Sequence, residues 1–184
     1  MIEAGDLEKG LIIKVDKQLF KVLDYEFMKM GRGIAHVKAS LKNLKTGNII
    51  KKTFRSTERL EEVELSYQSA TFLYKDRKSA VFLRDGKRIS FPLEEIGDKV
   101  YYLTERLEVK IIYLDETPYS IELPIKVDLK VIDTPPYIKG ATVASNTKLA
   151  TLETGLKVKV PMFIKPGDVI RVNTETGEYT ERIK

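Results

Sequence analysis

Hydrophobic and polar residues alternate along most of the chain with a period of two, which is the period of a half-buried β-strand. Residues 34–44 are the clearest case, because Val37, Ala39 and Leu41 share one face and the residues between them are polar or charged. The same pattern predicts further strands at residues 11–15, 18–25, 49–54, 79–83, 88–91, 169–174 and 178–183. We therefore expect an all-β protein.

Short turn sequences separate the predicted strands. Thr46-Gly47, Asp85-Gly86 and Thr176-Gly177 each stand between two apolar runs, as in β-hairpins. The one helical start is at residues 92–96, where a proline and two glutamates suit a first turn and Gly97 ends it. Short strands with frequent turns favour small β-barrels over a parallel sheet covered by helices.

The length of 184 residues leaves room for several small modules. A charged stretch at residues 56–64 ends the first run of strands, and a second boundary lies at residues 124–127. We expect three β-barrel domains, with boundaries at residues 1–62, 63–126 and 127–184. Each has about 60 residues, which is near the lower size at which a hydrophobic core suffices for stability.

The net charge of +5 is distributed unevenly. Residues 1–60 hold 13 basic and 7 acidic side chains, whereas residues 61–126 hold 10 and 13. A basic first segment favours a polyanionic partner that is bound mainly by this part of the chain. Charge also varies along basic proteins that have no such partner, and composition leaves both interpretations open.

Several function classes lack the residues that they need. The chain has no cysteine and one histidine, His36, which excludes disulfides and most zinc and nucleophile sets. It has no phosphate-binding loop or dinucleotide fingerprint, and its many carboxylates suit a solvated surface. We expect no secretory signal and no membrane-spanning stretch, because residues 1–3 include an acid and no apolar run approaches the length of a membrane span. We expect a cytoplasmic protein that is not an enzyme and has no metal or cofactor.

One local feature has an unusual composition, the sequence Met30-Gly31-Arg32-Gly33 between two predicted strands. Gly31 and Gly33 permit a tight reversal and leave no Cβ atom beside Arg32. The guanidinium of Arg32 would then stand at the apex of a hairpin, where it suits phosphate or ribose oxygens. Lys29, Lys38 and Lys42 flank this tip and would attract an RNA backbone. An ordinary solvated turn is the alternative, and the motif alone favours it.

Several stretches together carry a family resemblance. They are residues 30–35, 42–47, 52–54, 148–155, 158–161 and 176–179, with Arg182. On these stretches the chain resembles bacterial translation elongation factor P, nearly from end to end. The most specific of them is the block at residues 148–161.

The resemblance implies a fold and a function. The expected fold is an N-terminal SH3-like (KOW) barrel followed by two OB-folds, in an elongated arrangement like that of a tRNA. The family binds the 70S ribosome between the peptidyl-tRNA and exit sites, in contact with rRNA and peptidyl-tRNA. It promotes peptide bond formation where consecutive prolines stall synthesis. The resemblance thus implies a monomeric translation factor with no membrane partner.

The resemblance also assigns roles to single residues. It implies that Arg32 reaches the CCA end of the peptidyl-tRNA and that an arginine rhamnosyltransferase is a further partner if Arg32 is glycosylated. In the C-terminal domain it implies ribosome or tRNA contacts by four residues, Gly140, Thr142, Tyr179 and Arg182. The loop at residues 140–147 departs from the family pattern, because it lacks the usual aspartate and the later glycines.

Three alternatives stay open at this stage. The elongation-factor-P-like paralogue also tends to lack that aspartate. A general OB-fold RNA-binding protein would need exposed aromatic platforms, and a β-rich scaffold would dock a protein partner through the acidic middle domain. We expect the aromatic residues to pack in strand cores instead, namely Tyr25, Phe27, Tyr67, Phe72, Tyr74, Tyr101 and Tyr102.

Overall fold

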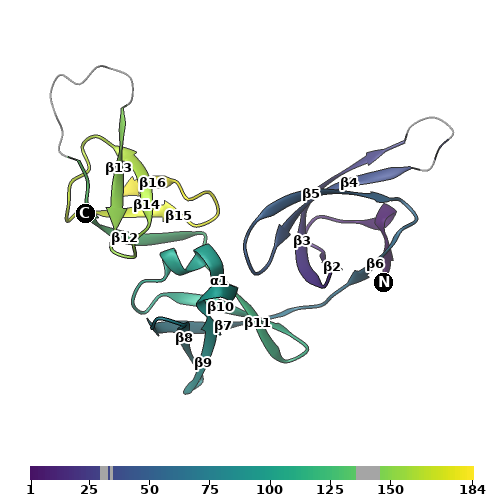
Figure 1. Ribbon diagram of the computed structural model, residues 1–184, viewed down its shortest axis with the longest axis horizontal. Coiled ribbons are helices and arrows are strands. Elements are labelled where there is room, and N and C mark those ends of the chain that lie inside the picture. The colour runs from purple at the N-terminus through teal and green to yellow at the C-terminus, as the bar shows by residue number, and fades with distance from the viewer. Residues whose placement is uncertain (30–32, 34, 136–145) are drawn as a thin grey trace. The chain divides into compact units, whose positions relative to one another are not determined.

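The computed structural model of the chain describes residues 1–29, 33, 35–135 and 146–184. In these residues, sixteen β-strands form three antiparallel sheets, with one short helix and two 3₁₀ turns between them (Figure 1). The predicted all-β fold class is therefore confirmed. The predicted strands are present, and the predicted helical start is the four-residue helix α1, Leu93–Ile96. Gly97 ends it with φ of 59°, a conformation that favours glycine.

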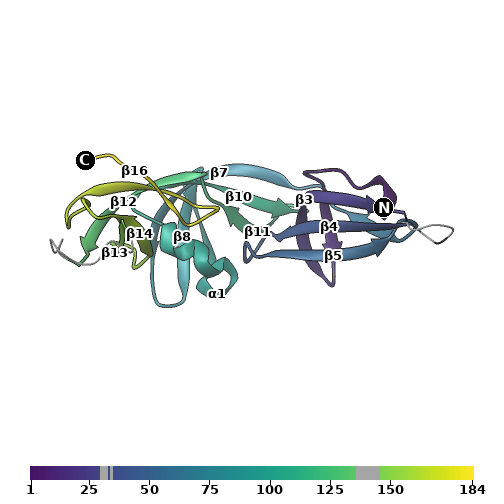
Figure 2. The same cartoon turned by 90° about the horizontal axis from the view of Figure 1, so that it is seen from above.

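The first sheet has six strands in the order β1-β6-β2-β3-β4-β5. β3 and β4 are its longest strands, and they lie side by side with β5 in both views (Figures 1 and 2). A 3₁₀ turn at Ala4–Asp6 follows the first strand. The strands are β1 (Ile2–Glu3), β2 (Ile12–Val15), β3 (Gln18–Met28), β4 (His36–Asn43), β5 (Ile49–Arg55) and β6 (Arg59–Glu62).

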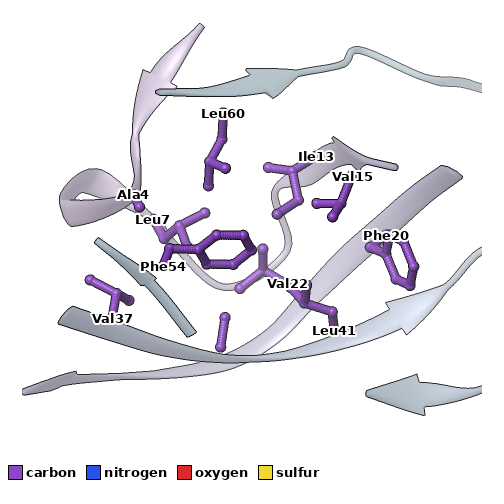
Figure 3. Close-up of a cluster of buried hydrophobic side chains, with 11 residues drawn as sticks. Ala4, Leu7, Ile13, Val15, Phe20, Val22, Val37, Leu41, Phe54 and Leu60 are labelled. Atoms are coloured by element: carbon purple, nitrogen blue, oxygen red, sulfur yellow. The ribbon is translucent and has the colours of Figure 1, made fainter. Parts of the chain in front are cut away.

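The first sheet curls around a core of aliphatic side chains and two phenylalanines (Figure 3). Val37, Ala39 and Leu41 all point into it, as their alternation predicts, and each is at most 1% exposed. Phe54 of β5 lies among them and is 2% exposed. Because one face of β4 is buried in this way, a shift of one residue in its pairing would expose the whole apolar set.

The second and third sheets each have five strands. Their orders are β11-β10-β7-β8-β9 and β14-β13-β12-β15-β16. A 3₁₀ turn at Gly97–Tyr102 follows α1. The strands are β7 (Ser66–Lys75), β8 (Ser79–Arg84), β9 (Lys87–Pro92), β10 (Glu108–Leu114), β11 (Thr117–Glu122), β12 (Lys126–Asp133), β13 (Thr147–Leu152), β14 (Lys157–Pro161), β15 (Val169–Asn173) and β16 (Tyr179–Arg182).

The described chain forms two compact units. The first joins residues 1–68 with 111–121, and the second joins residues 69–110 with 122–184. In the second unit, Tyr102 from the 3₁₀ turn packs into the core of the third sheet, and Thr154 Oγ1 donates to the carbonyl of Tyr101. The three domain boundaries that the sequence suggests stay a prediction.

The charged stretch at residues 56–64 is more than a boundary. It contains β6, which pairs with both β1 and β2 and so belongs to the first barrel. Only Leu60 of this strand is buried. A four-residue strand with a single buried residue shows no period-two alternation, which explains why the sequence pattern did not predict β6.

The same turn occurs twice, once in each unit. The side-chain oxygen of Asn43 accepts hydrogen bonds from the backbone N–H groups of Lys45 and Thr46, at 2.9 and 3.0 Å. Asn173 does the same for Glu175 and Thr176, at 2.8 and 3.1 Å. Each turn then ends on a glycine with positive φ, 77° at Gly47 and 73° at Gly177. The two turns differ in one contact: a Cβ atom at Gly177 would lie 3.3 Å from the Tyr102 hydroxyl, whereas one at Gly47 would meet nothing within 4 Å.

This pair allows backbone strain to be separated from a packing contact. Both Gly47→Ala and Gly177→Ala place a Cβ atom at positive φ, and each should lower the free energy of unfolding by about 1 kcal/mol. Gly177→Ala should cost more than Gly47→Ala, because it also displaces the Tyr102 hydroxyl. Hydrogen–deuterium exchange of the flanking strands, β4–β5 against β15–β16, measures both effects. Equal losses at the two sites would contradict the Tyr102 contact.

Candidate nucleic-acid interface

The candidate site is built on a long two-stranded ribbon, β3 and β4. Their pairing runs from Phe20 opposite Asn43 to Met28 opposite His36. The connection between them holds the motif that the sequence analysis singled out. Gly33 is exposed in a bend, whereas Gly31 and Arg32 lie outside the described residues. The predicted hairpin is confirmed up to its last described residues, and the contact assigned to Arg32 stays a prediction.

The outward face of the ribbon and of β5 is basic. Opposite residues of an antiparallel pair share a face, so Lys38 shares its face with Thr53, His36 with Arg55, and Ser40 with Lys51. At the start of β3, Lys21 stands opposite Lys42. The face thus combines the predicted Lys38 and Lys42 with three cations that the sequence analysis did not select, Lys21, Lys51 and Arg55. Lys29 is exposed just after β3.

Two carboxylates interrupt this basic face, Asp24 and Glu26. Lys9 lies 2.8 Å from Asp24, and both side chains are mostly exposed. The hydrogen bond from Lys9, with one from the Tyr25 backbone N–H, holds the pKa of Asp24 below its ordinary value. Glu26 stands opposite Lys38. The five cations of the face outnumber these two carboxylates, so the face is predominantly positive, which suits a phosphate backbone.

Lys52, on the inward face of β5, has different surroundings from the lysines of the outward face. Lys52 follows Lys51 along the strand and so points to the other side. Its ammonium group lies 2.9 Å from Asp16 and 5.9 Å from the centre of the Phe54 ring. Lys52 thus pairs with Asp16 of the same domain in a surface ion pair, whereas its neighbour Lys51 is exposed on the other face.

The prediction that the aromatic residues pack in cores is wrong for most of them. Phe72 and Tyr102 are buried, at 4% and 9% exposed. Tyr25 and Phe27 are 40% and 53% exposed, although Ala39 and Val37, which stand opposite them in β4, are buried. The pairing of β2 with β3 ends at Lys21, before these two residues. Three others are 41–47% exposed, namely Tyr67, Tyr74 and Tyr101.

The C-terminal residues selected from the sequence have different surroundings. Tyr179, the first residue of β16, packs against the core of the third sheet. Arg182 ends the same strand, and its guanidinium lies 5.5 Å from the centre of the exposed Phe163 ring and 3.8 Å from Asp168. Arg182 and Phe163 line a groove of about 1100 Å³, and Tyr179 does not. Gly140 and Thr142 lie outside the described residues, so the contacts assigned to them stay predictions.

Other kinds of site are not found in the described residues. No three histidine or acidic side chains in residues 1–29, 33, 35–135 and 146–184 come close enough together to hold a metal ion. In the same part of the chain, no helix has the length and apolar character needed to cross a membrane.

Comparison with known proteins covers the whole chain. The family model for the elongation factor P KOW-like domain matches residues 3–60, the one for its OB domain matches residues 65–121, and the one for its C-terminal domain matches residues 127–182. The chain belongs to the elongation factor P family. The expected order of a KOW-like domain followed by OB domains is confirmed. Family membership also makes the chain a translation factor and not an enzyme.

Relatives of full length support this assignment. The chain is 46% identical over 184 residues to elongation factor P of Thermotoga maritima, covering 99% of this chain and 100% of the relative. It is 40% identical over 185 residues to elongation factor P of Caldanaerobacter subterraneus subsp. tengcongensis, covering all of both chains. Among solved structures, translation initiation factor 5A from Methanococcus jannaschii is similar, with a TM-score of 0.48 and 19% identity over 66% of this chain and 91% of that one.

The pairing of Lys9 with Asp24 gives a pH-dependent prediction. Replacing Lys9 with alanine should raise the pKa of Asp24 toward its ordinary value of about 3.9, and the rise should be partial because the Tyr25 N–H still donates. The stabilisation by this pair is present above the ordinary pKa of Asp24 and is lost as the pH falls through the lowered one. A carboxyl-carbon NMR titration of wild type and Lys9→Ala measures the shift. An unchanged Asp24 pKa would contradict the ion pair.

Proposed function

We propose that this chain binds the 70S ribosome between the peptidyl-tRNA and exit sites and stimulates peptide bond formation where consecutive prolines stall synthesis. The observation that carries the proposal is the β3–β4 ribbon. Together with β5 it presents a face on which cations outnumber the two carboxylates, and Arg32 belongs to the connection at its far end. The factor acts in the cytoplasm as a monomer, with rRNA and peptidyl-tRNA as its partners.

The cations of the ribbon have complementary roles in this function. Lys29, Lys38 and Lys42, with Lys21, Lys51 and Arg55, attract the RNA backbone without regard to sequence. Arg32 donates hydrogen bonds to the CCA end of the peptidyl-tRNA, for which its planar, permanently charged group is suited. Gly31 and Gly33 keep side chains away from its base. In the C-terminal domain, Gly140, Thr142, Tyr179 and Arg182 contact ribosomal or transfer RNA.

The rate enhancement comes from positioning. Proline is a poor nucleophile in this reaction, and its ring restricts the geometry of the nascent chain. Holding the tRNA end in a reactive arrangement lowers the barrier through orientation, without proton transfer from the protein. Each 1.4 kcal/mol or so of improved positioning corresponds to about a tenfold faster reaction.

Removing the guanidinium at the tip tests the function directly. In a reconstituted translation system with a Pro-Pro-Pro message, Arg32→Ala should lose most of the stimulation that the wild-type factor gives. Arg59→Ala, which removes an exposed arginine of β6 in the same barrel, is the matched control and should keep it. Full stimulation by Arg32→Ala would contradict the proposed role of the tip.

The two neighbouring lysines of β5 test the basic face. Lys51→Ala should weaken ribosome binding about threefold to tenfold at low salt and lower the slope of log affinity against log salt by about one, because it removes a phosphate contact. Lys52→Ala removes the same charge from the inward face and should leave both quantities near wild type. Binding measured by sedimentation at several salt concentrations gives the comparison. Equal effects of the two variants would indicate that ribosome binding depends on the total charge of the protein and not on the outward face of β5.

Rhamnosylation of Arg32 is part of the proposal, with an arginine rhamnosyltransferase as a further partner. A tryptic mass spectrum of the protein from its natural host decides this point. A deoxyhexose mass on the peptide that contains Arg32, with no cleavage after it, is the expected result. Cleavage after Arg32 without the added mass would exclude the modification in that host.

A general RNA-binding role is the second candidate. The exposed aromatic rings support it, because such proteins stack bases on aromatic side chains beside a basic groove. Tight, salt-sensitive binding to free oligonucleotides would favour this role. Binding that requires a ribosome with an occupied peptidyl site would favour the translation factor.

The paralogous elongation-factor-P-like protein is an alternative within the family. The full-length relatives at 40–46% identity are named elongation factor P, and they favour the main factor.

A further inference from the structure

The end of the ribbon opposite the tip, which we call its root, is held by the hairpin of β10 and β11. The root consists of Leu19 in β3 and Leu44 just after β4. With Ile12 of β2, these leucines form a second apolar cluster, apart from the core in Figure 3. Leu114 and Tyr119 of the hairpin pack against this cluster. Residues 111–121, which include Leu114, Tyr119 and Ser120, belong to the same compact unit as the ribbon.

Two hydroxyl groups extend this apolar contact into a continuous chain of hydrogen bonds. The Ser120 hydroxyl donates to the Leu44 carbonyl at 3.1 Å. The Leu44 N–H donates to the Leu19 carbonyl at 3.0 Å, and the Leu19 N–H donates to the Tyr119 hydroxyl at 3.3 Å. Consecutive residues of β11 thus bind the backbone of both strands of the root. Leu19 and Ser120 are 2% and 3% exposed, so water is a poor substitute for these partners.

Two further contacts hold the same place. The Lys45 ammonium lies 5.0 Å from the centre of the Tyr119 ring, within the range of a cation–π interaction. Next to the root, the Asn43 side-chain amide donates to the Gln18 side-chain oxygen at 2.7 Å and links the two strands. The root is therefore cross-linked both between its own strands and to the hairpin.

We propose that Tyr119 and Ser120 are positioning residues, which set the direction of the ribbon by holding its root and so place the tip on the ribosome. This inference rests on the proposed function of the tip. It assigns to the hairpin a role in the stimulated reaction, although neither residue touches RNA or the reacting groups.

The length of the ribbon makes its root important. Its paired part extends over roughly 25 Å at about 3.3 Å per residue. A tilt of about 5° at the root would then move the far end by roughly 2 Å. Misplacement by 1 Å is enough to reduce a rate by as much as about 100-fold where catalysis depends on orientation. A loose root would therefore lower the rate on the ribosome even when the factor is bound.

The first test measures the geometry of the full-length protein. The chain has no cysteine, so Lys29→Cys and Thr117→Cys place one spin label after β3 and one on the hairpin, both at exposed positions. Pulsed electron paramagnetic resonance then gives the distribution of distances between the labels. The double variant Tyr119→Phe/Ser120→Ala should broaden this distribution. An unchanged distribution would overturn the proposal.

The second test measures the stimulated reaction with unlabelled proteins. At saturating factor, the double variant should stimulate synthesis through Pro-Pro-Pro about threefold to tenfold less than wild type, with the half-saturating concentration changed by less than about twofold. A lower maximal stimulation with a nearly unchanged half-saturating concentration distinguishes a positioning role from weaker binding or partial unfolding. Tyr119→Phe alone keeps the ring and its apolar contacts, so it carries the test if the double variant does not fold.

The matched control is Tyr74→Phe/Ser66→Ala, which removes one hydroxyl of each kind from exposed positions of β7. It should behave as wild type in both tests. A broadened distance distribution with undiminished stimulation would overturn the positioning role and leave the proposed function standing. If wild type itself gives no stimulation, the proposed function fails, and the positioning inference fails with it.

Discussion

The pairing register of β3 and β4 decides which side chains of the ribbon face the barrel core and which face outward. Val37, Ala39 and Leu41 hold this register, because a shift by one residue would place the apolar set in water and the charged set in the core. The basic face is a consequence of the same constraint. Lys38 and Lys42 are outward because the residues between and beside them are buried, so the stability of the barrel and the charge of its surface have one cause.

The two ends of the ribbon have opposite surroundings. At the root, backbone groups of Leu19 and Leu44 are bound by hydroxyl groups of the neighbouring hairpin and covered by apolar side chains. Toward the far end β3 is no longer paired with β2, and Tyr25 and Phe27 are exposed although Ala39 and Val37 opposite them are buried. This arrangement suits a ribbon that extends into a partner molecule. The packed root determines the direction of the ribbon, and the exposed far end is available for contact with the partner.

Some alternating elements were predicted from the sequence, whereas β12, in which Val127, Leu129 and Val131 are buried in strict alternation, was not among the predicted strands. β4 was predicted with its inward and outward faces because eight alternating residues leave one consistent assignment. β6 was missed because a single leucine is buried in it. The outward direction of Lys21, Lys51 and Arg55 was not assigned either, since it depends on how β3 and β5 pair with β4. The exposure of Phe27 depends on which strands pair with β3 and how far their pairing extends, which is a tertiary property.

The sequence by itself determined the all-β class, the glycine-ended turns and the family, because period-two alternation, turn chemistry and long motif matches are local properties of the chain. Only the tertiary structure decided that Lys51 and Lys52 serve opposite faces of the barrel, and that Tyr119 and Ser120 bind a ribbon about 75 to 100 residues earlier in the chain. Those contacts join segments that are far apart in sequence. Their geometry depends on how the strands pair and pack, which no local pattern records.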